Sequence, residues 1–357
     1  MAEVKPFRAV RYGVPAGPLE ALVAPPYDVI TAEQRDELRA CSPHNVVHLT
    51  LPDDEAEAGR FWSDWRAEGV LAEDDEPAFW WLSQDYVGPD GVERTREGLV
   101  AALKIEPYED RGVLPHERTH RGPKEGRLRL LRETHAQLEP LFFLYEGGPP
   151  AGRPEGTPDL EADRARLWRL AADPSISAAF AERQLLIADG HHRYETALAY
   201  HDEAGTPESA YVLAVLVSLE DPGLMIFATH RLFERVAADG GAPYEDVRLA
   251  LGDLEGEPPD RARGVLYRRQ GVEMLQGGPG QLDVELADGL DAEGVSYTAS
   301  VDEAIESVET GDVEGALLVR PTRVEDVYAW AQQGRVMPQK TTYFYPKLVS
   351  GLLFLPL

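Results

Sequence analysis

The feature that most constrains the fold is a short apolar run that changes into a helical pattern within two residues. Residues 184–188 (QLLIA) are apolar after the first position, and the apolar residues of 194–200 (YETALAY) recur at helical spacing. Asp189 and Gly190 lie between the two patterns. The sequence therefore predicts a strand, a tight turn and a helix over residues 184–202, with the first helical N–H groups facing a cleft.

The residues of this turn, 189–193 (DGHHR), suit an anion. Gly190 allows backbone angles that other residues avoid, and the free N–H groups of a helix start attract negative charge. Arg193 adds a planar fork for phosphate oxygens, and His191 and His192 add donors or a base. Asp189 is placed to hold magnesium or to take a proton. The alternative is a plain helix start capped by Asp189, with the histidines there by chance.

The remaining patterns predict an α/β fold, with α+β left open, around a mixed sheet. We expect strands at 78–84, 97–105, 141–145, 315–319 and 351–355, helices at 126–138, 160–172, 301–308 and 324–332, and a hairpin of 211–219 with 224–229.

Length and linker composition predict two regions. At roughly 100–200 residues per domain, a chain of 357 residues suggests two domains, or one large domain with insertions. The clearest linker is 147–158 (GGPPAGRPEGTP), so we expect an N-terminal α/β region over 1–146 and a C-terminal one over 159–357 that carries the turn. We expect the two regions to share one site.

Charge and cysteine content exclude several classes of protein. Cys41 is the single cysteine, so an intramolecular disulfide and a multi-thiolate zinc site are excluded, and a reducing compartment is favoured. The net charge of −28 argues against nucleic acid as a partner. No apolar run approaches the roughly 18 residues that span a bilayer. We expect a cytoplasmic protein without a membrane partner, and the oligomeric state stays open.

The turn and several distant stretches resemble one family. Residues 189–198 (DGHHRYETAL) look like the signature of the domain of unknown function 1015 (DUF1015) family. The other matching stretches are 6–9 (PFRA), 24–30 (APPYDVI), 45–49 (NVVHL), 116–119 (HERT), 122–124 (GPK) and 337–347 (MPQKTTYFYPK). The resemblance covers nearly the whole chain, and it implies a family more firmly than an activity.

More distantly, residues 190–193 (GHHR) are similar to the nucleotide-phosphate turn of the ParB/sulfiredoxin superfamily. That superfamily includes partition proteins, sulfiredoxins and free-serine kinases. A sulfiredoxin needs a cysteine in the turn, where this chain has His191, and the charge argues against a DNA-binding partition protein. The resemblance therefore implies a kinase, although the catalytic acid of those kinases has no aligned counterpart here.

Residues 116–120 (HERTH) match the zinc-protease pattern H-E-x-x-H, which needs both histidines on one helix face. Pro115 and the Gly-Pro pair at 122–123 leave no room for a long helix, so we predict a loop or short turn over 116–124 without zinc. A phosphate or substrate loop is the functional interpretation, and a structural loop is the alternative.

In that functional interpretation Glu117 is a candidate general base, and Lys124 and Arg127 contact phosphate. Further candidate substrate-binding residues are Asp28, His48, His116, Thr119, Lys340 and Lys347. Each has a structural alternative: turn building around Asp28, satisfaction of buried backbone by His48, and exposed lysines flanking a buried strand. Only five lysines occur in the chain, so their clustering in motif-like stretches favours a site.

These observations support two hypotheses. The first is a phosphotransferase that uses ATP or ADP with Mg²⁺ and acts on a small hydroxyl metabolite, with free serine as the leading acceptor. Gly190, His191 and Arg193 then hold phosphates, Asp189 binds the metal, and Glu117 or His192 deprotonates the acceptor. The second is a non-catalytic nucleotide or anion sensor with the same pocket.

Overall fold

The computed structural model describes residues 2–117, 122–238, 240–256 and 260–357, and they form two compact units. Unit 1 comprises Met1–Gly88, Val92–Leu224 and Pro346–Leu357, and unit 2 comprises Pro89–Gly91 and Met225–Tyr345. The predicted division at 147–158 is therefore wrong. The chain after that linker returns to unit 1, because its strand Ala165–Leu170 pairs with the strand Phe79–Val87 from the N-terminal half.

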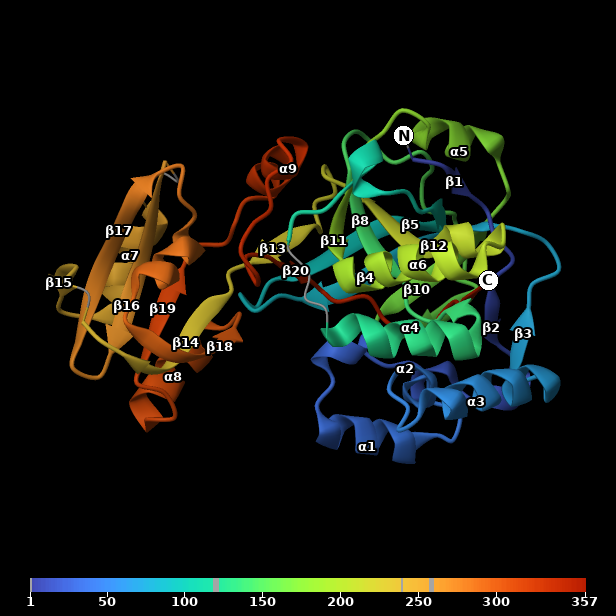
Figure 1. The fold of residues 1–357 in the computed structure, drawn as a ribbon, viewed down its shortest axis with the longest axis horizontal. Helices are drawn as coiled ribbons and strands as arrows, with labels where there is room; N and C mark the ends of the chain where they lie inside the picture. The colour runs from blue at the N-terminus through green and yellow to red at the C-terminus, as the bar shows by residue number, and fades with distance from the viewer. Residues whose placement is uncertain (1, 118–121, 239, 257–259) are drawn as a thin grey trace. The chain divides into compact units, whose positions relative to one another are not determined.

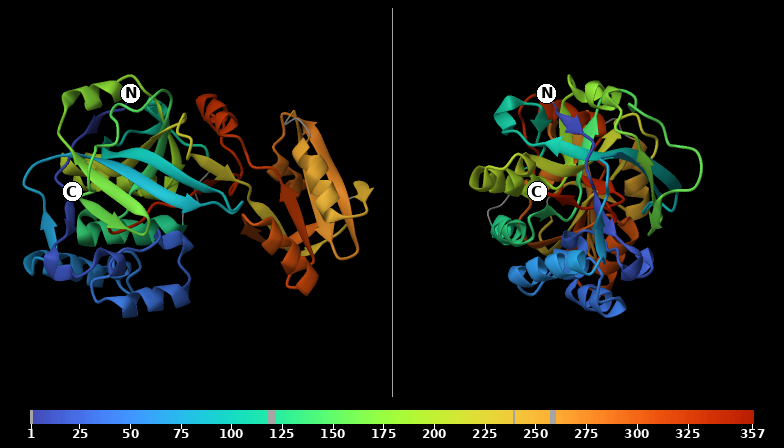
Figure 2. Two further views of the ribbon diagram at one scale, coloured as in Figure 1. Left: turned by 180° about the vertical axis from the view of Figure 1, so that it is seen from behind. Right: turned by 90° about the vertical axis from the view of Figure 1, so that its right-hand side faces the viewer.

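Unit 1 is built on a mixed sheet (Figure 1). Its strands lie in the order β6 (Val113–Leu114), β11 (Leu185–Asp189), β8 (Leu141–Tyr145), β12 (Tyr211–Ser218), β5 (Glu93–Lys104), β4 (Phe79–Val87), β10 (Ala165–Leu170) and β9 (Leu160–Ala162), and β1 (Val4–Lys5) also pairs with β5. β6 is parallel to β11 and β8 is parallel to β12, whereas the other pairs are antiparallel. The predicted α/β class with a mixed sheet is confirmed. The view from behind in Figure 2 shows the long strands β4 and β5 side by side within this sheet.

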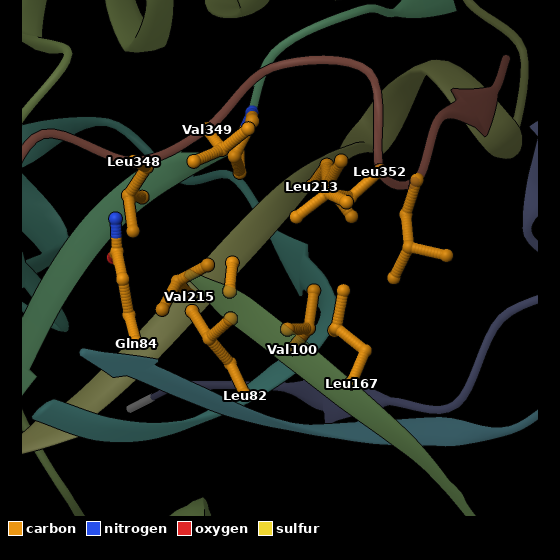
Figure 3. Close-up of a pocket in the computed structure, with 12 residues that line it drawn as sticks. Leu82, Gln84, Val100, Leu167, Leu213, Val215, Leu348, Val349 and Leu352 are labelled. Atoms are coloured by element: carbon orange, nitrogen blue, oxygen red, sulfur yellow. The ribbon is translucent and has the colours of Figure 1, made fainter. Parts of the chain in front are cut away.

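Two helices cover one face of this sheet. α5 (Pro174–Phe180) and α6 (His191–Ala204) bury Phe180 and Tyr194 against the apolar side chains of β8 and β11. The opposite face is covered by the C-terminal segment 348–353. It leaves an apolar cavity of about 20 Å³ over Leu82 and Val215 (Figure 3). The sheet is therefore buried on both sides, which accounts for the continuous apolar runs of β8 and β12.

A helical layer completes unit 1. It comprises α1 (Ala32–Cys41), α2 (Val47–Thr50), α3 (Glu55–Ala67) and α4 (Gly122–Thr134), with the short pairs β2 (Val10–Tyr12)–β3 (Leu71–Glu73) and β7 (Ala136–Gln137)–β21 (Leu355–Pro356). α3 packs on α4 around Trp62, Leu130 and Phe354. Among the described residues, no helix combines the length and the apolar character needed to cross a lipid bilayer.

Unit 2 contains a six-stranded antiparallel sheet. The order is β15 (Ala242–Tyr244), β17 (Gly271–Pro279), β16 (Arg261–Arg268), β19 (Gly315–Val319), β14 (His230–Val236) and β18 (Ala292–Thr298). α7 (Val247–Gly256) and α8 (Val301–Thr310) pack on one face, and a 3-10 segment, Asp283–Gly289, packs on the other. α9 (Val324–Gln332) and the pair β13 (Met225–Phe227)–β20 (Tyr343–Tyr345) complete this unit.

Three local predictions are wrong. Residues 160–172 form β9 and β10 rather than a helix, because Trp168 pairs across the sheet with Trp81 and tertiary pairing overrides the helical pattern. Residues 211–219 and 224–229 make no hairpin, since β13 pairs with β20 instead. In the predicted strand 351–355 only Leu355 is in a strand, and it pairs with Gln137.

Candidate functional site

The turn between β11 and α6 has the predicted strand-turn-helix form. Gly190 has φ 98° and ψ 25°, a left-handed conformation that favours glycine. A Cβ atom at this position would lie 3.2 Å from both Arg193 Nη2 and Leu141 Cγ. The N-cap residue is Gly190, and it has no side chain to accept a hydrogen bond from the first N–H groups of α6. The helix therefore presents its first N–H groups without the capping acceptor that Asp189 was expected to supply in the structural alternative.

Asp189 is instead the centre of an ion-pair network. Its Oδ2 accepts a hydrogen bond from Arg193 Nη2 at 2.8 Å, and its Oδ1 accepts one from Lys347 Nζ at 2.5 Å. Burial opposes ionisation of the carboxyl, but Lys347 and Arg193 outweigh it and hold the pKa of Asp189 well below its usual range. Arg193 Nη1 also donates to the carbonyl of Pro140 at 2.7 Å. The Nη atoms of Arg193 thus face protein oxygens rather than forming the predicted fork towards a ligand.

Two histidines, His116 and His191, contact each other beside the turn and are neutral. His116 Nδ1 donates to the carbonyl of Ile187 at 2.7 Å, and the His116 backbone N–H donates to His191 Nε2 at 3.3 Å. The two rings meet edge to face with centroids 4.7 Å apart. Burial lowers the pKa of His116 to about 4 and lowers that of His191 well below 6.5. Both rings therefore act as neutral packing and hydrogen-bonding groups at pH 7.

A second cation lies beside this network on α4. The guanidinium of Arg127 stacks 3.3 Å from the ring centre of Tyr27, and its Nη1 lies 3.4 Å from Glu139 Oε2. Glu139 Oε1 accepts from the backbone N–H of Tyr27 at 3.0 Å and from Ser350 Oγ at 3.2 Å. Arg127, Glu139 and Arg193 line one cavity of about 30 Å³, so α4 and α6 bring two arginines to the same place.

The other predicted site residues are distributed as follows. Glu117 is partly exposed and follows His116 directly, which places it beside the turn, and His192 is partly buried in the first turn of α6. Asp28 is exposed in a 3-10 turn, Tyr27–Val29, and its charge helps to raise the pKa of Arg193 against the effect of burial.

His48 and Lys340 are two further predicted residues. His48 bonds the carbonyl of Ser42 through Nε2 at 3.2 Å and packs on Phe61, which fits the structural alternative. The nearby Asn45 donates from Nδ2 to the carbonyls of Ala21 and Val23, so it satisfies buried backbone groups. Lys340 belongs to unit 2.

The loop predicted over 116–124 is correct only in part, because α4 already begins at Gly122. Thr119 lies outside the described residues, as does the side chain of Lys124. His116 is not in a helix, and its Nδ1 is bonded to Ile187, so this histidine does not have the helical setting that the zinc-protease pattern requires.

A magnesium ion fits Asp189 poorly. Both carboxylate oxygens already face cations, whereas Mg²⁺ takes oxygen ligands in a near-octahedral arrangement. Within the described ranges no group of three or more His, Cys, Asp or Glu residues is arranged to hold a metal ion. We therefore assign no step to a metal held by Asp189.

Glu139 and Arg96 were not predicted from the sequence. Glu139 stands just before Pro140 and β8, where nothing in the local pattern distinguishes it. Arg96 had a usable signal, because the alternation of β5 places it on the same face as Gly98 and Val100, which is an inward position for a charged residue. Arg96 is 1% exposed.

The fold and the site together define a mixed α/β protein with an uncapped helix start bordered by buried ion pairs. The chain belongs to the family described as "Protein of unknown function (DUF1015)", which matches residues 4–248. No curated protein matches it.

Solved structures give weak similarities. A free serine kinase in complex with AMP has 14% identity and a TM-score of 0.37, with 71% of this chain and 92% of that chain covered. A conserved hypothetical protein from Pyrococcus furiosus has 15% identity and a TM-score of 0.36, with 71% and 95% covered. SbnI with a C-terminal truncation from Staphylococcus aureus has 11% identity and a TM-score of 0.38, with 70% and 85% covered. The function is therefore argued from the residues.

Proposed function

We propose that this protein binds a nucleotide at the amino end of α6 and transfers a phosphoryl group to a small hydroxyl metabolite. The observation that carries the proposal is the helix start itself, which has Gly190 as its N-cap and therefore no side-chain cap from the N-cap residue. Such a helix end offers hydrogen-bond donors and the positive end of the helix dipole to a phosphate. Gly190 lets the phosphate approach the backbone closely.

The charges around the turn favour an anion. Arg193, Lys347 and Arg127 supply three positive charges, and Asp189 and Glu139 supply two negative ones. Among these buried or partly buried groups one positive charge is in excess, and its attraction for an anion is stronger there than in bulk water. Asp28 also acts on Arg193, but it is exposed, so water and salt screen its charge. In this proposal the backbone N–H groups bind the phosphate, and Arg193 contributes charge and holds the turn.

Proton transfer needs a base on the acceptor side. Glu117 and His192 are the candidates, because Glu117 follows the His116 that contacts the turn and His192 lies in the turn. His116 and His191 are not suited to this role, since burial keeps both rings neutral and their nitrogens bond protein groups. Free serine is the first acceptor to test, since it is the substrate of the kinases that the turn resembles.

Thermal-shift measurements with ADP, ATP and CTP, each with magnesium, test the nucleotide part of this proposal. A nucleotide at about a hundred times its dissociation constant should stabilise the fold by roughly 2.7 kcal/mol. The absence of a shift with every nucleotide would reject the proposal. A product assay with labelled nucleotide and serine then separates a kinase from a sensor that binds without turnover.

A further inference from the structure

A buried arginine of β5 lacks the partners that its charge requires. Arg96 donates from Nη2 to Gln84 Oε1 at 2.7 Å, and its guanidinium lies 4.5 Å from the ring centre of Phe142. Its Nε and Nη1 atoms have no hydrogen-bond partner among the described residues. Burying a charged group without hydrogen-bond partners costs several kcal/mol. We therefore expect an arginine in this state to bind a ligand.

The arginine keeps its charge in spite of burial. Burial lowers the pKa of Arg96 only to about 10, so the guanidinium is positive at neutral pH. Its hydrogen-bonding partner Gln84 is neutral. Asp221 and Asp189 are carboxylates that favour its charged form electrostatically.

Arg96 lies next to the ion-pair network of the α6 turn. Gln84, which accepts from Arg96, donates from Nε2 to the main-chain carbonyl of Lys347 at 2.9 Å, and the side chain of Lys347 reaches Asp189. Phe142, which lies under the guanidinium, pairs with Asp189 between β8 and β11. Two independent connections therefore bring Arg96 to the same end of the sheet as the proposed phosphate site.

We propose that Arg96 binds the carboxylate of the acceptor, which makes that acceptor a small hydroxy acid or hydroxy amino acid. This inference rests on the proposed function, because it assigns the second substrate of the same site. A guanidinium is the side chain best matched to a carboxylate, and a buried pairing of this kind also excludes uncharged alcohols.

A carboxylate suits this position better than a phosphate. Asp221 and Asp189 both interact with Arg96 electrostatically, and their negative charges disfavour a dianion more than a monoanion. Asp221 is held in place, because its Oδ2 accepts from the backbone N–H of Glu97 at 3.3 Å and its Oδ1 from that of Gly223 at 2.9 Å.

Entry of the ligand requires movement of the residues that cover Arg96. The loop that contains Gly223 packs directly on the backbone of β5. A Cβ atom at Gly223 would lie 2.7 Å from the backbone nitrogen of Arg96. The C-terminal segment is held against β4 by the hydrogen bond from Gln84 Nε2 to the carbonyl of Lys347. Acceptor binding therefore involves opening of one of these two contacts.

The test uses thermal shift and calorimetry on the full chain with defined probes. These are L-serine, glycolate and L-lactate as carboxylates, ethanolamine and ethylene glycol as analogues without the carboxylate, and inorganic phosphate, each with and without ADP. Among the five acceptor analogues, we expect only the three carboxylates to stabilise the protein, and any stabilisation by phosphate or ADP should not depend on Arg96. Arg96→Met should weaken their binding about 30-fold or more, since it removes one partner of a buried charge pair. Arg132→Met, which removes an exposed arginine paired with Glu203, should leave it unchanged.

Stability without ligand is the second measurement. Replacing an unpaired buried charge by an apolar chain should leave the unfolding temperature unchanged or raise it, whereas loss of a structural arginine would lower it. Should Arg96→Met fail to fold, Arg96→Lys, which keeps the charge but not the planar group, takes its place in both measurements and should bind carboxylates more weakly than the wild type.

The inference is overturned by carboxylate binding that survives in Arg96→Met, by phosphate stabilisation that depends on Arg96, or by the absence of a shift with every carboxylate. Failure of the proposed function has a different signature. In that case no nucleotide stabilises the wild-type protein, while the carboxylate measurements without ADP still report on Arg96.

Discussion

The Nζ atom of Lys347 lies 2.5 Å from Oδ1 of Asp189, although 158 positions separate the two residues in the chain. The contact fastens the C-terminal segment of unit 1 to the turn that precedes α6. It also neutralises part of the carboxylate that would otherwise repel an anion at the helix start. The carbonyl of Lys347 also accepts a hydrogen bond from Gln84, the partner of Arg96. One short stretch of chain therefore contacts both the α6 turn and the residue that bonds Arg96.

The first prediction concerns this ion pair. Lys347→Met should lower the free energy of unfolding by about 2 kcal/mol, because it leaves a mostly buried carboxylate with one cation instead of two. The exposed pair of Lys104 and Glu3 is the control, and Lys104→Met should cost less than about 1 kcal/mol. Urea unfolding measures both. Equal costs for the two variants would show that the Lys347–Asp189 contact adds nothing beyond a surface ion pair.

The second prediction concerns Gly190. Gly190→Ala should cost about 1–3 kcal/mol, because it forces a side chain into a left-handed backbone and against Arg193. Gly205 ends the same helix with φ 63° and open space around it, so Gly205→Ala isolates the backbone part of the cost. Gly190→Ala should be the less stable variant in urea unfolding, and it alone should lose nucleotide binding. A nucleotide affinity that is unchanged in Gly190→Ala would argue against a phosphate on this turn.

The turn could be predicted from the sequence because its signals are local. A continuous apolar run, a glycine and a helical repeat follow each other within 20 residues, and the structure has β11, Gly190 and α6 there. The mixed sheet also followed from the pattern of strands and helices. The domain division failed because a Pro- and Gly-rich segment marks a break in regular structure, whereas unit membership depends on pairing between β10 and β4.

The roles within the site depend on distant partners and were harder to predict. The Nη atoms of Arg193 bond Asp189 and the carbonyl of Pro140. Pro140 directly precedes β8, and no pattern in residues 189–193 predicts that this segment lies beside the turn. The burial of His116 against His191 likewise depends on the parallel pairing of β6 with β11. Arg96 was detectable in principle from the alternation of β5, but its missing partners are visible only in three dimensions.

The third prediction is a loss of stability in mild acid through His116. The pKa of this ring is about 4 in the folded protein, against 6.5 for an unperturbed histidine. Below pH 6.5 the unfolded chain takes up a proton that the folded chain does not, so stability falls as the pH drops towards 4. At pH 5 the fall from this residue should reach about 2 kcal/mol.

His116→Gln should remove about 2 kcal/mol of the wild-type loss between pH 7.5 and pH 5 and leave the part due to His191, whose pKa burial also lowers. His135→Gln, which alters a histidine outside the His116–His191 pair, should behave like the wild type. Urea unfolding at the two pH values provides the measurement. The same acid sensitivity in His116→Gln and the wild type would mean that the buried ring is not the group responsible.

The fourth prediction separates two roles for Asp189. If Asp189 holds Mg²⁺, Asp189→Asn should weaken binding of ADP in magnesium about tenfold and have no effect in EDTA. If its work is to hold Arg193 and Lys347, as the ion pairs indicate, removal of a negative charge beside the helix start should strengthen ADP binding about threefold in both conditions. We expect the second result.

Arg193→Met is the companion variant, because it removes the cation and leaves Asp189 in place. Loss of that positive charge next to a bound phosphate should weaken ADP binding about tenfold, with and without magnesium. Isothermal titration of both variants therefore gives changes of opposite sign if the phosphates lie at the start of α6. Changes of the same sign in EDTA would place the nucleotide elsewhere, because no anion bound at that helix end could respond alike to the loss of a neighbouring negative and a neighbouring positive charge.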